Sequence, residues 1–571
     1  MEFKIENVKN KNGDVLKYRG NQVKQVTLKK KNKKGYSRDV VVEQVNDLND
    51  ELKELGFNGS IMVTLNHGGR QYYSGRFTDI QTEEPDIFHL NDYGNENAQD
   101  PEHYADFIIY VTKYKDNKET KTKEPKLKGG SIEETDEVTT DEIKPTKTVL
   151  KAFGYSLSDS KILINRRKPN GKCDIYADGE LFENKDNSYV KNIENKPRTS
   201  GYLVVHAKKD DKRPLKEIYD EFIKTADILK EKTNGKINLY RTGSTTNTSK
   251  YHFIKFNEKR LIECETIIGK EEKWISDATM GALQHAIKYE GVSYGLDVNS
   301  FYAFILNSNF RIPIRQGKYE TATFQYPFKS HVTYGIYRVT ITGNINKFLF
   351  RKNPCNVYTS IDINRAIKLG YEVKYIIDGE PNRIIYGKND FIEAKTLFGE
   401  YIEYFYNLKK NGCQEAKIFL TSLWGWLTAK ETMILSNNET YDIDDKKEIV
   451  SMHPINDTET RIEVNKVNQV YKTAYARFAP FLLARARELI GEMYENQIDD
   501  VVRVAVDGFI MKKELKNAKL GNEIGQLKKE DKYTGTIKIH HVNKIDHYCY
   551  RCDTYISCQS RGFEKHQENC I

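Results

Sequence analysis

The chain has 571 residues, enough for about two to four domains with a sizeable core. Its 90 Lys and Arg against 82 Asp and Glu leave a formal charge of +8, a mild basic excess that permits a polyanionic partner without requiring one. No apolar run reaches the roughly 18 residues of a membrane-spanning helix, and the first residues lack a signal-peptide core. We therefore expect a soluble protein inside a host cell, in the cytoplasm or an organelle, neither secreted nor membrane-bound.

Residues 1–114 are expected to form a small α/β accessory domain. VEQVNDLNDELKELGF has apolar residues at helical spacing and ends near Gly56, which predicts a helix. IMVTL and RQYYSGRF flank the turn NHGG and predict a hairpin, and DFIIYVTKY predicts a further strand. The KKKNKK run from Lys29 to Lys34 could bind phosphates, but such a cluster is more typical of a solvated loop.

Two further regions precede the motifs with a specific chemistry. Residues 115–148 have dense mixed charge and no apolar periodicity, which predicts a charged flexible linker. Residues 149–275 are expected to form a mixed α/β domain, in which LKEIYDEFIKTADILKE is the clearest amphipathic helix.

Two later segments each place an aspartate beside an apolar run. YGLDVNSFYAFIL puts Asp297 at the end of a short strand, ahead of the start of an apolar helix. VRVAVDGFIM puts Asp507 in an Asp-Gly hairpin turn, where both positions favour positive φ, so that Asp507 could be a turn former and nothing more. Two carboxylates from separate strands can, however, hold two divalent ions against a triphosphate.

A third segment, KKNGCQEAKIFLTSLWGWLTAK, is predicted to be one helix. Its spacing puts Lys410, Lys417 and Thr421 along one side, with Trp424 and Gly425 after it. The lysines could neutralise a nucleoside triphosphate, although lysines on a helix are usually solvated.

In this order, the three segments resemble the polymerase motifs of family B DNA polymerases, and most closely those of the protein-primed subgroup of phages, viruses and linear plasmids. DVNSFY resembles motif A (D-x-x-S-L-Y), KIFLTSLWG resembles motif B (K-x-x-x-N-S-x-Y-G), and VAVDGF resembles the D-T-D-S turn of motif C. The similarity continues between and around the motifs. VYTSIDINRAIKLGYEVKYIIDG resembles the subgroup's strand–helix–strand insertion, AYARFAPFLLARARELIGEMYEN resembles the palm helix, and IGQLKKE resembles L-G-x-W-x-x-E. ATMGALQHAIKYEG resembles the family's Tyr-x-Gly-Gly element.

The resemblance implies a multidomain fold of the α/β and α+β classes. Residues 276–548 would form a right-hand polymerase with a palm (an antiparallel sheet plus helices), fingers and thumb, and residues 149–275 would be a degenerate exonuclease-like domain. The best match to the Asp-x-Glu of such an exonuclease is Asp178-Gly179-Glu180, but this triplet arises easily among 82 acids and has no convincing acidic partners. Proofreading is therefore expected to be absent.

Carried over by position, the resemblance implies that Asp297 and Asp507 are the catalytic carboxylates and bind two Mg²⁺ ions, with the Val298 carbonyl as a further ligand. Tyr302 would lie under the sugar and exclude a 2′-hydroxyl. The residues implied to bind the incoming nucleotide are Val298, Asn299, Ser300, Tyr302, Lys409, Lys410, Lys417, Thr421 and Trp424. Those implied to contact the template or other DNA are Gly281, Ala282, Gly425 and Lys544.

The implied function is a template-directed DNA polymerase that adds dNTPs to a primer 3′-hydroxyl by a two-metal mechanism, in the replication of a mobile element or virus. Its partners would be primer-template DNA, dNTPs and, in the protein-primed subgroup, a terminal protein. The chain departs from the family pattern, with Ala505 in place of the first Asp of motif C and Thr421 in place of the Asn of motif B. Two alternatives stay open: a weak or inactive polymerase-derived nucleic-acid-binding protein, or a template-independent nucleotidyltransferase.

Residues 549–571 are expected to form a zinc-finger-like tail. Cys549-x2-Cys552 and His566-x3-Cys570 are separated by thirteen residues, a spacing typical of one tetrahedral Zn²⁺ site. Metal binding would supply the folding energy that so short a module cannot obtain from apolar burial. Cys558 would be a spare thiol, Phe563 would fill the small core, and the alternative is a loose cysteine-rich tail.

Overall fold

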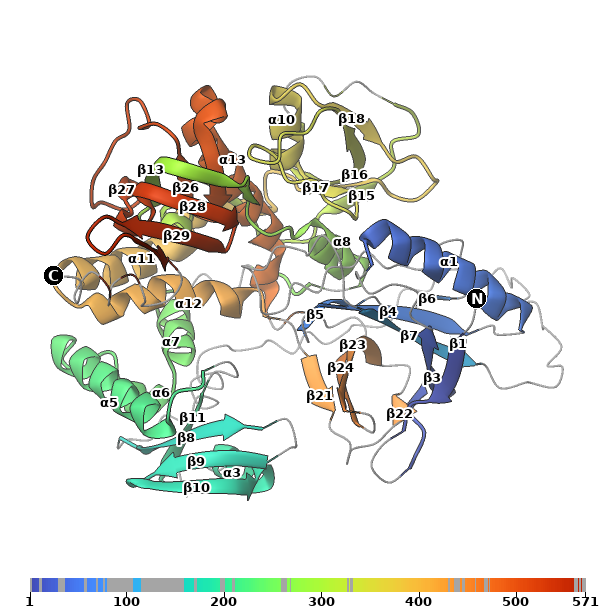
Figure 1. Ribbon diagram of the computed structural model, residues 1–571, viewed down its shortest axis with the longest axis horizontal. Coiled ribbons are helices and arrows are strands. Elements are labelled where there is room, and N and C mark those ends of the chain that lie inside the picture. Colours follow the sequence, from blue (N-terminus) through green and yellow to red (C-terminus); the bar gives the residue numbers. More distant parts are fainter. Residues whose placement is uncertain are drawn as a thin grey trace.

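The computed structural model describes most of the chain and shows a mixed α/β protein with six sheets in its described part (Figure 1). The described residues are 3–9, 13–28, 36–55, 59–67, 70–74, 78–79, 106–113, 159–168, 172–195, 201–207, 211–257, 264–267, 269–325, 328, 332–429, 432–435, 442–443, 447–456, 459–466, 471, 473–558, 563 and 566. The predicted linker, the Lys29–Lys34 run and Cys570 lie outside these residues. Within them, no helix has the length and apolar character needed to cross a bilayer.

An eight-stranded sheet, here called the central sheet, holds both aspartates singled out in the sequence. Its order is β12-β25-β26-β13-β28-β29-β30, with β27 also paired to β13, and every pairing is antiparallel. Its strands are β12 (Gln284–Ala286), β13 (Tyr289–Val298), β25 (Val501–Ala505), β26 (Gly508–Met511), β27 (Leu527–Lys529), β28 (Gly535–His541), β29 (Lys544–Cys549) and β30 (Thr554–Ser557). Strands far apart in the sequence, β13 and β26, are therefore neighbours.

Helices cover one face of the central sheet and form the largest apolar core with it. Leu296 and Val298 of β13 and Phe509 of β26 are buried in this core. On the helix side, the Phe405 and Phe419 rings lie 4.6 Å apart between centroids. The helices that contribute are α5 (Leu215–Lys232), α7 (Thr245–Asn257), α9 (Phe301–Leu306), α11 (Ala394–Lys410), α12 (Lys417–Leu427) and α13 (Ala479–Tyr494).

The segment between the first two motifs forms a separate lobe, drawn in yellow beside the central sheet (Figure 1). The predicted strand–helix–strand is observed as β17 (Val357–Thr359), α10 (Ser360–Lys368) and β18 (Glu372–Tyr375). Thr359 and Asp362 form a capping box at the start of α10, which satisfies free backbone N–H groups there. The other strands are β14 (Arg311–Pro313), β15 (Lys318–Glu320), β16 (Gly335–Thr342), β19 (Arg383–Ile385) and β20 (Phe391–Glu393).

Two buried ion pairs lie where this lobe meets the helices around the central sheet. The pair of Arg487 and Asp362 spans the junction, and Arg477 reaches the lobe by donating to the Ile314 carbonyl at 3.2 Å. Arg477 donates to both carboxylate oxygens of Glu271, on α8 (Lys270–Ala278), at 2.8 and 2.9 Å, and both side chains are fully buried. Arg487 of α13 donates to Asp362 at 2.7 Å. Because removing one member of such a pair leaves a buried charge without a counter-charge, these contacts specify how the lobe docks.

The N-terminal residues form all but one strand of a second eight-stranded sheet, and these strands are drawn in blue shades (Figure 1). Helix α1 (Arg38–Glu54), which matches the predicted helix, begins after the Ser37 cap and covers one face through Val41, Val45 and Leu48. The strands are β1 (Phe3–Asn7), β2 (Lys17–Tyr18), β3 (Asn21–Leu28), β4 (Ser60–His67), β5 (Arg70–Ser74), β6 (Thr78–Asp79), β7 (Asp106–Lys113) and β22 (Asp442–Ile443).

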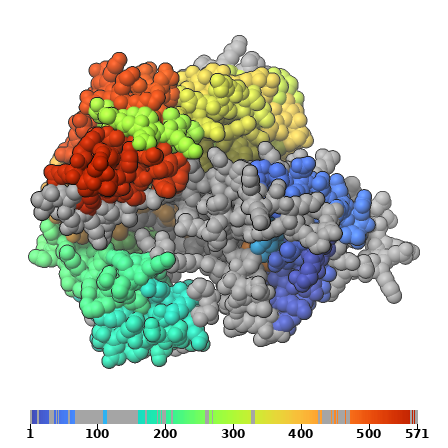
Figure 2. All heavy atoms as spheres, viewed as in Figure 1, coloured from blue at the N-terminus to red at the C-terminus, as the bar shows by residue number. Residues whose placement is uncertain are grey.

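This N-terminal sheet also takes part of its structure from outside residues 1–114. Strand β22 pairs in parallel with β2. The hairpin of β23 (Lys447–Asn456) and β24 (Glu459–Lys466), with β21 (Thr432–Leu435) on its edge, buries Ile449 and Met452 against Val23 and Tyr110 of the sheet. In the space-filling view, the N-terminal sheet and the red C-terminal strands lie on opposite sides of the molecule (Figure 2).

The region of the predicted 149–275 domain contains a four-stranded sheet of order β10-β9-β8-β11. The first three strands are antiparallel, and β11 returns parallel to β8. The strands are β8 (Lys161–Arg167), β9 (Lys172–Ala177), β10 (Glu180–Asp186) and β11 (Tyr202–His206), and the helices beside them are α3 (Asn187–Asn195), α5 and α6 (Leu239–Thr242). Asp178 and Gly179 form the β9–β10 turn with φ of +51° and +86°.

Candidate active site

The structure brings Asp297 and Asp507 to the same end of two neighbouring strands. Asp297 of β13 lies directly opposite Gly508 of β26 in the antiparallel register, and Asp507 immediately precedes Gly508. The Val298 N–H donates to the Asp507 carbonyl at 2.8 Å, so the backbones of the two segments are bonded at this point. Two acids 210 positions apart in the sequence (507 − 297) are thus held next to each other.

The hairpin turn that holds Asp507 differs from the predicted Asp-Gly turn. Its two central residues are Val506 and Asp507, and Gly508 is already the first residue of β26. Val506 has a φ of +60°, a conformation that β-branched residues rarely adopt and that therefore stores strain. Gly508 instead allows β26 to pass close to β13. A Cβ at this position would lie 3.1 Å from the Leu296 carbonyl oxygen and 3.4 Å from Asp297 Oδ1.

The electrostatics of the pair fit a cation site. Burial and, second, the charge of Asp297 raise the pKa of Asp507 to about 6. Burial also raises the pKa of Asp297, although Lys528 acts in the opposite direction. Two partly buried carboxylates that disfavour each other's charge are stabilised by a divalent cation, and hard cations such as Mg²⁺ prefer carboxylate oxygens. The donor set therefore fits the implied metal.

Lys528 also belongs to this site, although no sequence motif predicted it. Its Nζ lies 3.0 Å from Asp297 Oδ2 and 3.0 Å from Glu530 Oε1. In the register of β13 and β27, Lys528 is the direct partner of Asp297, which places the two side chains on the same face. The stretch IGQLKKE contains Lys528, but a three-residue strand gives too little alternation to predict which lysine faces the site.

The residues after Asp297 form a fixed loop that leads into α9. The Asn299 N–H donates to the Gln526 carbonyl at 2.9 Å, and its side-chain amide donates to the carbonyls of Asn522 and Glu523. Ser300 has a φ of +53° and directly precedes α9, on which Tyr302 is half-buried. Val298 is buried, so its side chain belongs to the core rather than to the surface of the site.

The prediction of one continuous helix over the third segment is wrong. Helix α11 ends at Lys410, a short 3-10 helix spans Gln414–Ala416, and α12 begins at Lys417. The break follows from Gly412, which has a φ of +90° that a helix does not contain. Trp424 and Gly425 lie within α12 and not after a helix.

The break between α11 and α12 places the predicted phosphate-binding residues in different surroundings. Lys409 Nζ donates to Asn299 Oδ1 at 3.2 Å and so points toward the loop after Asp297. Lys410 instead pairs with Glu523 at 2.6 Å on the surface. Lys417 is exposed at the start of α12, and exposed Thr421, one turn later, donates its hydroxyl to the Ile418 carbonyl at 3.0 Å.

The predicted template-contacting residues lie on different elements, and Gly281 and Ala282 come next to the Asp507 turn, because the carbonyl of the following Leu283 accepts from the Val506 N–H at 3.1 Å. Gly281 and Ala282 offer their carbonyls to Arg487 and Arg351, each at 2.9 Å, and Ala282 is buried. Gly425 is exposed, with open space where a side chain would be. Lys544 is exposed at the start of β29, and β28 separates this strand from β13.

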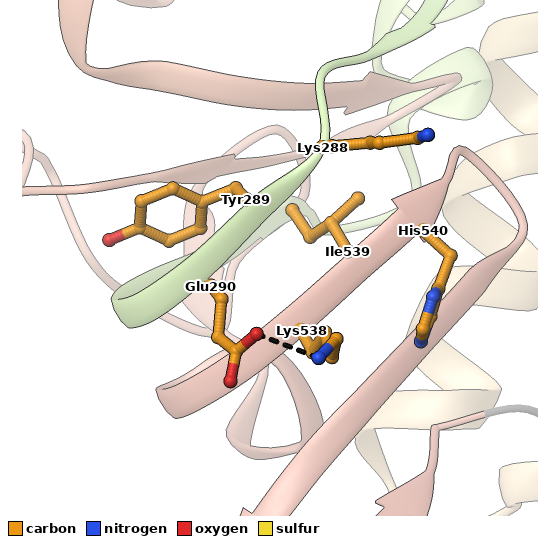
Figure 3. A pocket seen from close by; sticks show the side chains of 6 residues that line it. All are labelled: Lys288, Tyr289, Glu290, Lys538, Ile539 and His540. Atoms are coloured by element: carbon orange, nitrogen blue, oxygen red, sulfur yellow. Dashed lines mark ion pairs between the residues drawn. The ribbon is translucent and has the colours of Figure 1, made fainter.

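A surface cavity of about 370 Å³ lies elsewhere on the central sheet (Figure 3). It is near the start of β13, whereas Asp297 is at the other end of the strand. Within it, Glu290 and Lys538 form an ion pair at 2.8 Å, so the two charges neutralise each other. Its lining residues are Lys288, Tyr289, Glu290, Lys538, Ile539 and His540.

Three of the four predicted zinc ligands come together in the tail. The donor atoms of Cys549, Cys552 and His566 all lie within 4.8 Å of one another. A hydrogen bond with His566 is the main cause that lowers the pKa of Cys549 to about 6. Cys558 is separate, because it is buried, its thiol donates to the Lys532 carbonyl at 3.0 Å, and burial raises its pKa to about 12.

Phe563 is buried in the tail, and its ring lies 4.8 Å from that of His547. His547 is therefore a half-buried packing residue beside the tail.

Comparisons with known proteins define the class of this chain. Residues 152–481, more than half of the sequence, match the family described as DNA polymerase type B, organellar and viral. The chain therefore belongs to the organellar and viral branch of the type B DNA polymerases.

Individual relatives are more distant. A probable DNA polymerase of Neurospora intermedia is 27% identical over 238 residues, which cover 36% of this chain and 23% of the relative. The chain thus spans about a quarter of the length of that curated relative. Among solved structures, phi29 DNA polymerase complexed with single-stranded DNA has a TM-score of 0.42 at 14% identity, covering 74% of this chain and 82% of that chain. Its ternary complex with primer-template DNA and incoming nucleotides gives 0.42 at 15% identity, with the same coverage.

Proposed function

We propose that this protein is a template-directed DNA polymerase that adds deoxynucleotides to a primer 3′-hydroxyl, with divalent cations bound by Asp297 and Asp507. The observation that supports this most is the direct pairing of the two segments. Asp297 opposes Gly508, and Val298 N–H bonds to the Asp507 carbonyl at 2.8 Å. Membership of the type B DNA polymerases supports the same reaction class. In this proposal the central sheet is the palm, and α11 and α12 belong to the fingers.

The residues around the aspartates suit the reaction. When bound, two divalent ions would lower the pKa of the primer 3′-hydroxyl and stabilise the negative charge on the leaving pyrophosphate. Lys409 and Lys417 bring positive charge next to the loop at Asn299, where a triphosphate would be neutralised. Tyr302 on α9 would lie under the sugar and exclude a 2′-hydroxyl. Burial of the carboxylates keeps water away and strengthens these interactions.

We further propose that the enzyme lacks proofreading and replicates a viral or mobile element, with a terminal protein as a candidate primer. Asp178 supports the first point, because it bonds to Lys161 at 3.2 Å and to the Tyr202 hydroxyl in an exposed turn. The bonds from Tyr202 and Lys161 lower the pKa of Asp178, whereas burial raises the pKa of Asp297 and of Asp507, so the charge of Asp178 does not need a cation to stabilise it. The viral and organellar character of the family supports the second point.

Primer extension tests the main proposal. A labelled primer on a defined template is incubated with Mg²⁺ and each dNTP singly, using the wild type, Asp297→Ala and Asp507→Ala. We expect template-matched addition by the wild type and a loss of about 10³-fold or more in each variant, equivalent to about 4 kcal/mol of transition-state stabilisation. Asp531→Ala, a change at an exposed acid near the same sheet, is the matched control and should keep activity.

Other outcomes of this assay identify the alternatives. Addition without regard to the template would indicate a template-independent nucleotidyltransferase. An absence of product from a folded wild type that still binds primer-template would indicate a polymerase-derived binding protein, and the proposal would be wrong.

We also propose that the tail binds one Zn²⁺ through Cys549, Cys552 and His566, with Cys570 as the fourth ligand. The three clustered donors support this, since two thiolates and an imidazole are a typical zinc set. Metal analysis of the purified protein should find about one Zn²⁺ per chain, lost in Cys552→Ser and retained in Cys558→Ser. Equal zinc content in the wild type and Cys552→Ser would contradict this assignment.

A further inference from the structure

Lys528 is the cation closest to the carboxylate pair among the described residues, and the strand register fixes its position. Strand β27 pairs with β13 so that Lys528 directly opposes Asp297, on the strand edge opposite to Gly508. Its Nζ is 3.0 Å from Asp297 Oδ2, an ordinary charge-assisted hydrogen bond. One oxygen of the carboxylate that would bind a divalent cation is thus already engaged by an ammonium.

The backbone around Lys528 is held on both sides. The Glu530 N–H donates to the Gly295 carbonyl at 3.0 Å, and the Gln526 carbonyl accepts from Asn299 N–H at 2.9 Å. The Gly525 N–H donates to the Asn299 carbonyl at 2.8 Å. Because β27 cannot move away without breaking these bonds, Lys528 can respond to a cation only through its side chain.

Glu530 gives the ammonium a second acceptor beside the first. The Lys528–Glu530 distance is 3.0 Å, equal to that of Lys528 to Asp297. If Asp297 turns its oxygen to a divalent cation, Lys528 keeps its bond to Glu530 and stays charged and hydrogen-bonded. The lysine therefore has two stable arrangements, one with Asp297 engaged and one with Asp297 free.

We propose that Lys528 competes with the divalent cation for Asp297 and so sets the cation concentration at which the active site fills. The inference rests on the proposed function only in taking Asp297 and Asp507 as the cation site. As a consequence, the cation site stays empty at low divalent-cation concentration, because a cation that binds Asp297 must first displace the Lys528 ammonium.

The test is direct cation binding by the full-length protein, loaded with zinc to fill the tail. Mn²⁺ is the probe, because it accepts the same oxygen ligands and its free form is measured by electron paramagnetic resonance. Lys528→Met should bind Mn²⁺ about fivefold more tightly than the wild type, which corresponds to about 1 kcal/mol for a partly exposed ion pair. Lys528→Gln, a second uncharged variant, should do the same.

Matched variants separate competition from a general charge effect. Lys529 is the next residue of the same strand, faces the other way and pairs with Glu514 at 3.5 Å, so Lys529→Met should bind Mn²⁺ as the wild type does. Lys528→Arg keeps the charge and should also match the wild type. Asp507→Asn should abolish the Mn²⁺ site in both the wild-type and Lys528→Met backgrounds.

Two outcomes of the Mn²⁺-binding measurements would contradict competition by Lys528. Equal or weaker Mn²⁺ binding by both uncharged variants, with wild-type thermal unfolding, would show that Lys528 does not compete. A tightening of the same size in Lys529→Met would show a non-specific charge effect. If wild-type protein fails to extend primers but Lys528→Met still binds Mn²⁺ more tightly, the inference stands and the polymerase proposal fails.

Discussion

Val506, Asp507 and Gly508 show how far single residues could be predicted here. The Asp-Gly signal correctly located a hairpin, but it placed the turn one residue too late. The reason is that Gly508 is needed where β26 passes close to Asp297, so the left-handed position falls on Val506. The local preference for an Asp-Gly turn was overridden by the contact between β26 and β13. Local sequence rules do not include such a contact with a distant strand.

His252 supplies a pH-dependent test at the residue scale. It is buried on α7, with its ring stacked 6.2 Å from that of Tyr404, and burial lowers its pKa to about 4. The unfolded chain binds the proton near pH 6.5 and the folded chain does not, so the free energy of unfolding falls as the pH drops from about 6.5 toward 4.

We therefore expect His252→Phe to be less acid-sensitive than the wild type. By linkage, the neutral histidine costs the wild type about 2 kcal/mol of stability between pH 7 and pH 5, and the variant should lack that part of the loss. Urea unfolding at the two pH values measures it. The difference between the two pH values is the relevant quantity, since the variant also loses a bond to the Lys236 backbone. An identical loss in both proteins would contradict the assignment.

At the scale of elements, long periodic segments were predicted well and short ones were not. Helix α5 follows from apolar spacing, the strand–helix–strand β17-α10-β18 follows from the resemblance to the family's insertion, and both appear as expected. The break after Lys410 was missed because the apolar pattern continues through it, although Asn411-Gly412 is a turn signal. The result matters for the site, because the break separates Lys409, which faces Asn299, from Lys417.

Two of the shortest elements, which the sequence did not predict, have large consequences for the fold. Strand β27 has three residues and places Lys528 at Asp297, and β22 has two and joins the N-terminal sheet. Such strands contain less than one full repeat of the side-chain alternation that reveals a strand. They exist because a longer partner strand is already in place, so tertiary pairing and not local sequence defines them.

At the scale of the whole molecule, the site and the N-terminal unit both depend on contacts between distant segments. The hairpin β23–β24 lies in the chain between α12 and α13, and its buried face packs on the N-terminal sheet. The N-terminal sheet is thus attached to the segment that links two helices of the proposed polymerase. Composition and linker signals predicted several units, but only the assembled fold shows this connection.

The same scale applies to the active site, because neither Asp297 nor Asp507 forms it alone. The most direct test is a crystal structure of the protein with Mn²⁺ and a non-reactive dNTP, with the metal located by its anomalous scattering. We predict at least one peak within about 2.0–2.3 Å of oxygens from both Asp297 and Asp507, beside the triphosphate. Peaks that contact only one of the two carboxylates, or none at either, would contradict the central claim that they share divalent ions.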